Sequence, residues 1–262
     1  MVRLPLAFAP ALVLGASAGL LACASAPPQA FEELPSAEEL YEKGQQQVAD
    51  NEGFHLLPTD NAEAIQTFQD IIDNYPYSGQ AVLAQLAIGD AYFKQEKYEE
   101  AISYYRDFVE LHPEHEKVPY AMFQTVMSYY KQSKDSARDQ TATEEALQHL
   151  DRLLARFPDS SYAVEGEQLW RELRTRLAGH VMKVADYYYD QDEYPSAAER
   201  YRQIIDRYPG LGLDAEALYR LGVCYTRMNR TDEAQKIFQV ILENYGGSAV
   251  AEAAADLVPS AN

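Results

Sequence analysis

A pattern of small and aromatic residues at fixed spacing recurs along this chain of 262 residues. A small residue is followed three positions later by an aromatic residue, and nine positions after that by Ala. A second aromatic residue comes four positions later, and Pro eight positions after it. One complete copy consists of Gly89, Tyr92, Ala101, Tyr105 and Pro113. Such self-similarity indicates a series of similar structural units rather than one globular core.

Further copies keep the order of the pattern with substitutions or insertions. Two copies after residue 184 are continuous, and two earlier ones contain extra residues near 54–58 and over the polar stretch 133–143, which we expect to be loops. Their members are Leu40, Gly44, Ala64, Phe68 and Pro76; Tyr129, Ala146, Leu150 and Pro158; Ala185, Tyr188, Ala197, Tyr201 and Pro209; and Gly222, Tyr225, Ala234, Phe238 and Gly246. The chain therefore carries about five repeats.

The spacing has a physical cause. Small residues such as Gly89 let the first helix of a repeat approach the second closely, and aromatic residues fill the gap to the next pair. Pro113 and its counterparts end the second helix, because helices seldom continue through the residue before proline. One such pair cannot bury its apolar face alone, so neighbouring pairs stack. The pattern is typical of tetratricopeptide repeats and predicts an all-α fold, a right-handed superhelical solenoid of helix–turn–helix units.

A long helix is expected where the repeat pattern is interrupted. Residues 160–185 contain no break, and Leu169, Trp170, Leu173 and Leu177 keep helical spacing. We expect this helix to connect repeats 1–3 (residues 36–159) with repeats 4 and 5 in residues 160–250. Residues 251–262 are expected to form a cap or tail.

The N-terminus has the features of a secretory signal. Arg3 is followed by an uncharged, Ala- and Leu-rich run that ends in Leu-Leu-Ala before Cys23. This ending resembles the lipobox of bacterial lipoproteins, which implies that residues 1–22 are a signal peptide and that Cys23 becomes lipidated. Several acyl chains anchor a protein stably. Residues 23–35 are Pro-rich and are expected to form a flexible tether.

The charge of the chain excludes two classes of partner. Its formal net charge is -19, with 22 basic and 41 acidic residues. Such a chain repels the phosphates of nucleic acids and of anionic lipid surfaces. Membrane contact is therefore expected only through the lipid on Cys23. The other cysteine, Cys224, is expected to be a buried core residue.

Aromatic and aliphatic residues on the first helices of repeats 1–3 suggest a peptide-binding groove. One register, repeated across these helices, selects Tyr41, Leu83, Leu86, Phe93, Tyr120, Phe123, Met127 and Tyr130. Lys94 and Lys131 occupy equivalent positions beside this stripe and could hold the terminal carboxylate of a bound chain. The alternative is that the stripe is core and that both lysines cap helix ends.

Enzymatic signals are absent from the sequence. His112 and His115 flank Pro113, which breaks the helix that a metal-binding pair would use, and no third ligand is indicated. Phosphate-binding loops and nucleophile motifs are also missing. The carboxylates are interpreted as solvated helix faces. We therefore predict no catalytic site, metal or cofactor, and a protein that binds other proteins.

Further similarity lies in the segments 73–78, 91–94, 108–115, 120–123, 184–188 and 206–209. Together these segments resemble the BamD/ComL family of lipoproteins, which belong to the machinery that folds outer-membrane β-barrels. The resemblance implies an outer-membrane anchor facing the periplasm, and partners that comprise BamA through its POTRA domains, other assembly lipoproteins and unfolded barrel precursors. It also implies that Arg200 contacts BamA. A lipoprotein that organises peptidoglycan or division complexes is the alternative.

Overall fold

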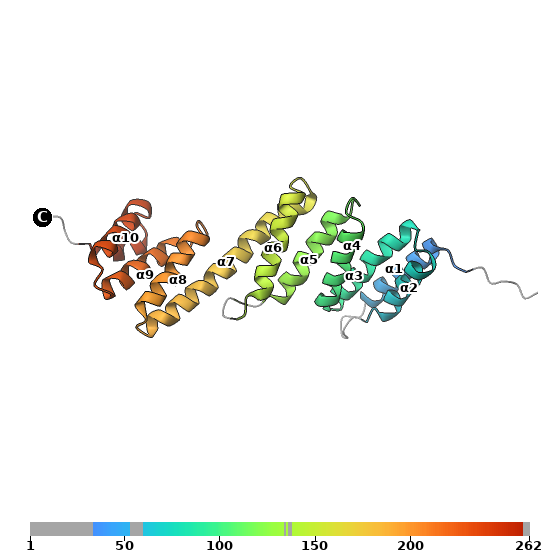
Figure 1. Cartoon of the computed structure of the whole chain (residues 1–262), viewed down its shortest axis with the longest axis horizontal. Coiled ribbons are helices and arrows are strands. Elements are labelled where there is room, and N and C mark those ends of the chain that lie inside the picture. Colours follow the sequence, from blue (N-terminus) through green and yellow to red (C-terminus); the bar gives the residue numbers. More distant parts are fainter. Residues whose placement is uncertain (1–33, 53–59, 134, 136–137, 259–262) are drawn as a thin grey trace, which may run out of the picture. The chain divides into compact units, whose positions relative to one another are not determined.

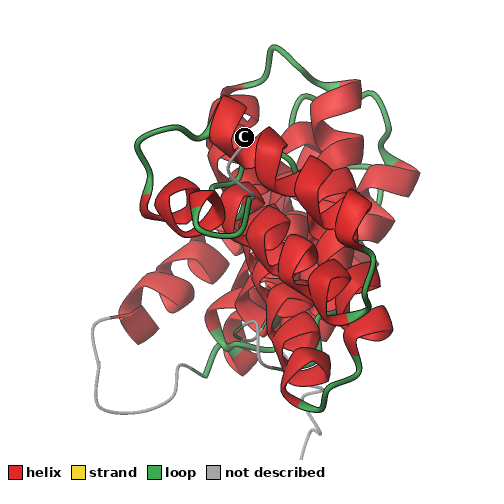
Figure 2. Cartoon of the chain, turned by 90° about the vertical axis from the view of Figure 1, so that its left-hand side faces the viewer, coloured by secondary structure: helices red, strands yellow, loops and turns green. Residues whose placement is uncertain are grey.

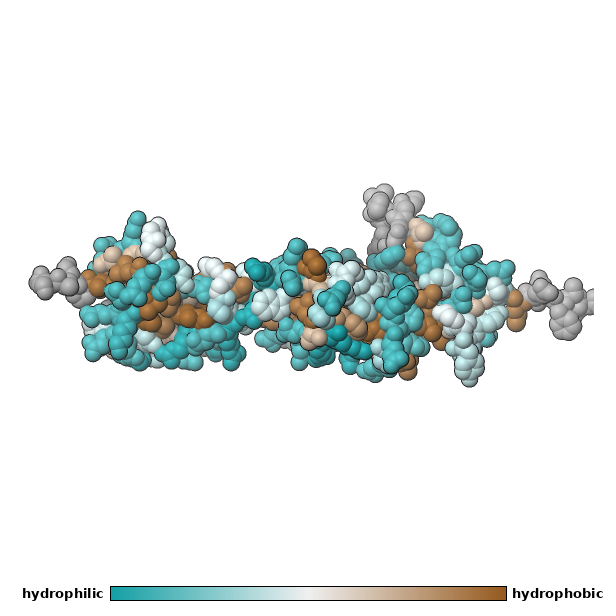
Figure 3. Space-filling view, turned by 90° about the horizontal axis from the view of Figure 1, so that it is seen from above, coloured by the Kyte–Doolittle hydropathy of each residue, from teal (hydrophilic) through white to brown (hydrophobic). Residues whose placement is uncertain are grey.

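The computed structural model describes residues 34–52, 60–133, 135 and 138–258. Across these residues it contains helices and connecting segments and no strand (Figure 2). The signal peptide, Cys23, most of the tether and the insertion near residues 54–58 lie outside the described residues. Among the described residues, no helix combines the length and the apolar character needed to span a membrane. Hydrophilic residues cover most of the face seen in Figure 3, with patches of apolar residues among them.

Successive helices pair in chain order (Figure 1). Each helix packs mainly on its neighbours in the chain, and contacts beyond them join chiefly α1 to α3, α5 to α7 and α9 to α11. This nearest-neighbour packing is that of a solenoid, so the predicted all-α repeat fold is confirmed. The helices are α1 (Ala37–Glu52), α2 (Ala62–Asn74), α3 (Gly79–Lys94), α4 (Tyr98–Leu111), α5 (Val118–Gln132), α6 (Thr141–Arg156), α7 (Ser161–Asp190), α8 (Tyr194–Arg207), α9 (Asp214–Arg227), α10 (Thr231–Asn244) and α11 (Ala249–Ala255).

Close approach of paired helices occurs at the small residues that the sequence selects. A Cβ atom built on Gly89 would lie 2.8 Å from Cε1 of Tyr105. A Cβ atom on Gly222 would lie 2.6 Å from Cε1 of Phe238. These separations are too short for carbon atoms, so the absence of a Cβ at Gly89 and Gly222 lets the facing ring lie this close to the first helix.

The third repeat solves the same packing problem with different residues. It has Val126 at the position of the glycine and Leu150 at that of the ring, and both are buried in one core cluster. A larger residue on the first helix is thus compensated by a smaller one on the second. This exchange of volume explains why the repeat is hard to recognise at this point in the sequence.

Proline marks the end of the second helix in four repeats. Helices α2, α4, α6 and α8 each end two residues before a proline, whereas α10 ends before Gly246 and Gly247. The residue after each of these five helices still donates its backbone N–H to the carbonyl four residues earlier, as Tyr75 does to Ile71 at 2.8 Å. The chain then turns, because the proline has no N–H with which to continue the helix.

Helix α7 has 30 residues and belongs to two parts of the core. Leu169 and Leu173 lie in the cluster formed with α5 and α6, whereas Val181 and Ala185 lie in the cluster formed with α8 to α11. The long helix expected from the uninterrupted stretch is therefore present, and it serves as the first helix of the fourth repeat in its second half.

Two boundaries differ from the expectation. Helix α6 begins at Thr141, three residues inside the stretch expected as a loop, and the buried Thr143 hydroxyl donates to Gln140 Oε1 at 3.0 Å. At the C-terminus, the stretch expected as a cap or tail from residue 251 begins inside α11, in which Ala251 and Ala254 are buried. Ser248 caps this helix by accepting a hydrogen bond from the backbone N–H of Ala251 at 3.2 Å.

Candidate functional site

The predicted groove residues on α5 contact helix α7. The rings of Phe123 and Tyr162 are stacked with centroids 5.3 Å apart, and the ring of Tyr120 lies 6.0 Å from that of Tyr162. Met127 and Tyr130 pack against the cluster that contains Leu173 of α7. The stripe on α5 therefore forms much of the contact between these two helices.

Two residues of the predicted groove are core residues. Leu86 is 3% exposed and Phe123 is 5% exposed, so neither offers a surface to a ligand. The periodicity of α3 and α5 does not separate them from their half-exposed neighbours, because one helical face can be covered by the next helix along only part of its length. These two residues are corrected from groove to core.

The other predicted groove residues keep exposed surface. Tyr41 is half-buried and lies 5.7 Å from the ring of Phe68, and Phe93 lies 5.4 Å from the ring of Tyr98. The full set with partly or fully exposed side chains is Tyr41, Leu83, Phe93, Lys94, Tyr120, Met127, Tyr130 and Lys131.

Asp90 on α3 connects residues from three helices. Its Oδ1 atom accepts hydrogen bonds from the hydroxyls of Tyr105 on α4 at 2.7 Å and Tyr120 on α5 at 2.6 Å. Burial raises the pKa of the Asp90 carboxyl, and the two hydroxyls and the nearby Lys94 oppose that shift. The interpretation of the carboxylates as solvated helix faces is therefore wrong for Asp90. The sequence feature that marks such a buried carboxylate is an Asp directly after the small residue of the repeat, with a Tyr fifteen positions after that Asp. Asp186 and Tyr201 have the same spacing.

The two lysines next to the groove have different surroundings. Lys94 is exposed in the last turn of α3, where its charge acts on Asp90, four residues earlier. Lys131 is exposed at the equivalent place on α5, but the residue four positions earlier is Met127. The position that holds the carboxylate of Asp90 beside Lys94 is therefore apolar beside Lys131.

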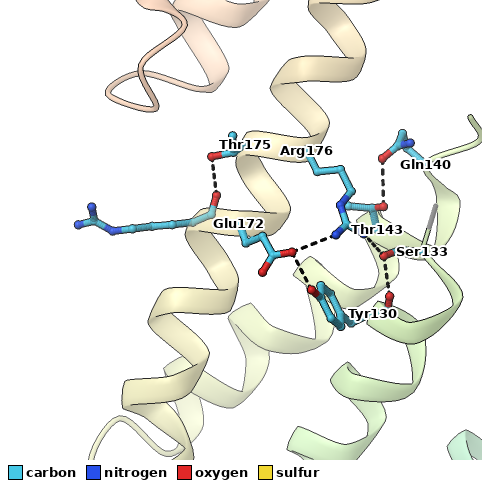
Figure 4. A network of polar contacts seen from close by, with 8 residues as sticks. Tyr130, Ser133, Gln140, Thr143, Glu172, Thr175 and Arg176 are labelled. Atoms are coloured by element: carbon cyan, nitrogen blue, oxygen red, sulfur yellow. Dashed lines mark hydrogen bonds and ion pairs between the residues drawn. The ribbon is translucent and has the colours of Figure 1, made fainter. Parts of the chain in front are cut away.

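A polar network joins the end of α5 to α7 (Figure 4). The Tyr130 hydroxyl donates to Glu172 Oε1 at 2.7 Å, and Arg176 donates to the same oxygen at 3.0 Å. Arg176 also donates to the Ser133 hydroxyl, which in turn donates to the backbone carbonyl of Tyr130 at 2.6 Å. The network fixes Tyr130 at one edge of the groove. Sequence reasoning did not identify Glu172 or Arg176, since their partners are about 40 residues away.

Arg200 lies on the exposed face of α8, beside an open pocket of about 580 Å³. It donates to Gln203 Oε1 at 3.1 Å. The pocket is formed by the segment before α6, by α6 itself, by α7 and by α8. Its basic residues are Arg138, His180, Arg200 and Arg207, and its acidic ones are Asp139 and Glu144.

Cys224, considered as a nucleophile, and His112 and His115, considered as metal ligands, lie against other side chains of the protein. Cys224 is buried, and burial raises the pKa of its thiol to about 11, which keeps it protonated. The rings of His112 and His115 each lie 5.3 Å from that of Phe108. Within the described part of the chain, no group of three or more potential metal-ligating side chains is present.

The known proteins to which this chain is similar are described as outer membrane lipoproteins or assembly factors. The family described as YfiO, outer membrane lipoprotein, matches residues 35–240. Outer membrane protein assembly factor BamD of Caulobacter vibrioides is 29% identical over 236 residues, covering 90% of this chain and 74% of that protein. BamD of Rickettsia prowazekii is 29% identical over 199 residues, covering 76% of this chain and 79% of that protein.

Solved structures are similar to this chain at a lower sequence identity. One of them is the TPR2AB domain of yeast Sti1 in its complex with pHSP90. It is 15% identical in sequence, has a TM-score of 0.39, and is matched over 81% of this chain and 81% of that chain. The family match rests instead on the sequence, and it includes all of α1 to α9 and most of α10. The resemblance carried by the repeat motifs is thereby confirmed, and the chain belongs to the YfiO/BamD family of outer membrane lipoproteins.

Proposed function

We propose that this protein is a lipid-anchored scaffold subunit of the machinery that assembles β-barrel proteins in the outer membrane. The observation that carries the proposal is the family match over residues 35–240, together with relatives that are named outer membrane protein assembly factors. A solenoid of stacked helix pairs suits this role, since it presents extended surfaces to more than one partner.

The proposed anchor is the lipid on Cys23, with the repeats on the periplasmic side. The lipobox-like sequence before Cys23 supports it, as does the description of the family as outer membrane lipoproteins. The net charge of -19 makes electrostatic attachment to anionic lipid unfavourable, so the acyl chains would supply the membrane affinity.

The proposed docking site for BamA includes Arg200. The exposed guanidinium lies beside a pocket with three arginines, and such a site favours a carboxylate from a partner because arginine can donate two parallel hydrogen bonds. Other assembly lipoproteins are proposed as further partners, without a site assigned to them.

The proposed site for unfolded barrel precursors is the half-exposed stripe on α1, α3 and α5. Tyr41, Phe93, Tyr120 and Tyr130 offer aromatic surfaces to an extended chain, and Lys131 offers a charge for a terminal carboxylate.

The first experiment is recovery of partners from detergent-solubilised envelope with the tagged, lipidated protein. BamA is expected in near-equal amount with the wild type, and Arg200→Glu is expected to reduce its recovery about tenfold. Arg171→Glu is the matched control, because Arg171 is an exposed arginine on α7 outside the pocket. Recovery of peptidoglycan-binding or division proteins without BamA would overturn the proposal.

A second experiment tests the precursor groove by itself. A labelled peptide that ends in a free Phe carboxylate should bind the wild type and lose about tenfold in affinity to Lys94→Glu/Lys131→Glu. The peptide amide should bind both proteins equally weakly. Lys43→Glu/Lys236→Glu changes the net charge by the same amount at exposed sites on α1 and α10, and serves as the control. Equal binding by all three proteins would exclude the lysines as the carboxylate site.

A further inference from the structure

A second basic pocket lies between α4, α5 and α6 and is not part of the sites proposed above. It has a volume of about 280 Å³, which suits one or two side chains of a ligand. Its lining residues are Arg106, Val109 and Glu110 of α4, Met122 and Thr125 of α5, and His149, Arg152 and Arg156 of α6.

This pocket is on the other side of α5 from the predicted precursor groove. An α-helix turns by about 100° per residue, so Met122 and Thr125 are rotated by roughly 100° and 200° from Phe123. Tyr120, Met127 and Tyr130, in contrast, fall within roughly 60° of Phe123. A ligand in this pocket would therefore contact the second helices of repeats 2 and 3, and it would leave the groove side of α5 open.

The charge of the pocket is opposite to that of the whole protein. Three arginines and one histidine line it, with Glu110 as the one acidic lining residue, although the chain carries a net charge of -19. The histidine ring stacks on Tyr129 at 5.2 Å. Burial lowers the pKa of His149, the charges of Arg152 and Arg106 lower it further, and the charge of Glu145 opposes them.

Two of the arginines have no polar partner of their own among the described residues. Arg156 donates to the Pro113 carbonyl at 2.8 Å and lies over the ring of Phe157. The guanidinium groups of Arg106 and Arg152 make no hydrogen bond or ion pair within the described part of the chain, and both are exposed. Arg156 is thus held in place, whereas the other two can take an external anion.

We infer that this pocket binds an acidic peptide segment of a partner protein, with a carboxylate between Arg106 and Arg152 and a neighbouring apolar side chain on Val109 and Met122. A single guanidinium group matches a carboxylate through two parallel hydrogen bonds, and two arginines that line one pocket add a second positive charge to hold it. The apolar floor favours a peptide over a free inorganic anion, because a peptide brings an aliphatic side chain next to its carboxylate. The negative charge of the protein also disfavours an extended anionic lipid surface.

The test is fluorescence anisotropy of a labelled short peptide of alternating Glu and Leu, with the full mature protein. The Glu peptide should bind, and its affinity should fall about tenfold in Arg106→Gln/Arg152→Gln. A peptide with Gln in place of Glu should bind as weakly as the Glu peptide binds that variant. Arg171→Gln/Lys183→Gln removes the same charge from exposed positions on α7 and should retain the affinity of the wild type.

A second variant keeps both arginines and blocks the pocket from within. Val109→Glu places a carboxylate beside the guanidinium groups and should also abolish peptide binding, with a circular dichroism spectrum like that of the wild type. Equal binding by the wild type and Arg106→Gln/Arg152→Gln would overturn the inference. So would equal displacement of the peptide by inorganic phosphate or by phosphatidylglycerol vesicles at matched anion concentration, since the site would then be a general anion site or a lipid site.

Discussion

The Tyr105 hydroxyl on the second helix of repeat 2 donates a 2.7 Å hydrogen bond to Asp90 on the first helix. Tyr201 and Asp186 make the same bond at 2.6 Å in repeat 4. In repeats 1 and 5 the ring is Phe68 or Phe238, and the residue after the glycine is Gln45 or Val223. Of these four repeats, the two whose buried ring carries a hydroxyl also have an Asp that accepts its hydrogen bond. The buried hydroxyl is therefore not left without an acceptor.

Removal of the hydroxyl at position 105 should destabilise the protein. Tyr105→Phe leaves the largely buried Asp90 carboxylate with the Tyr120 hydroxyl as the remaining one of its two tyrosine donors. This loss should lower the free energy of unfolding by about 1–2 kcal/mol. The measurement is urea denaturation followed by circular dichroism. Tyr104→Phe is the control, because that hydroxyl makes no hydrogen bond within the described part of the chain, and an equal loss in both variants would contradict the role of Asp90.

Asp90 should also give the stability a dependence on pH. Burial raises the pKa of this carboxyl in the folded state above the ordinary 3.8, so the folded state binds more protons than the unfolded state between those two values. The contribution of Asp90 to stability is therefore largest at low pH and is lost as the pH rises through the folded-state pKa.

The pH effect can be isolated with Asp90→Asn, which does not titrate. The free energy of unfolding of the wild type minus that of the variant should grow as the pH falls from 7 toward 3.8. Denaturation curves at several pH values give this difference. A difference that shrinks over the same range would mean that the pKa is lowered instead.

Two glycines in α3 should respond in opposite ways to alanine. Gly89→Ala forces a methyl group into the Tyr105 ring and should cost about 1–3 kcal/mol, whereas a Cβ on the exposed Gly79 meets nothing within 4 Å. Gly79→Ala should leave the stability unchanged or raise it slightly. Thermal melting of both variants tests this, and equal melting temperatures would refute the proposed close approach.

The turn between α3 and α4 offers a stabilising substitution. Glu96 has φ of 59°, and its place after the helix matches a Schellman turn, in which Lys97 N–H donates to the Tyr92 carbonyl at 3.0 Å. Glu96→Gly should stabilise the protein by about 0.5–1 kcal/mol, because glycine adopts this conformation without strain. Glu99→Gly, inside α4, should instead destabilise it by about 1 kcal/mol. A loss of stability in Glu96→Gly would show that the glutamate side chain contributes more than its backbone costs.

The repeat pattern of the sequence was sufficient to predict the solenoid fold and, in the four repeats that carry the proline, where the second helix ends. Gly89, Tyr105 and Pro113 act through local rules, namely the size of a side chain at a helix contact and the missing N–H of proline. These rules operate over one helix pair, so the spacing within a repeat was sufficient to predict both helices and where the second one ends.

Tertiary structure decided which residues of the aromatic stripe face solvent. Phe123 and Tyr130 lie on the same face of α5, two turns apart. Helix α7 brings Tyr162 onto Phe123, which is buried, whereas Tyr130 keeps exposed surface. The burial of Asp90 and the gathering of Arg106 and Arg152 at one pocket also depend on contacts between different helices. Burial and electrostatic environment are set by everything packed around a side chain, and helical periodicity records only the face on which that side chain lies.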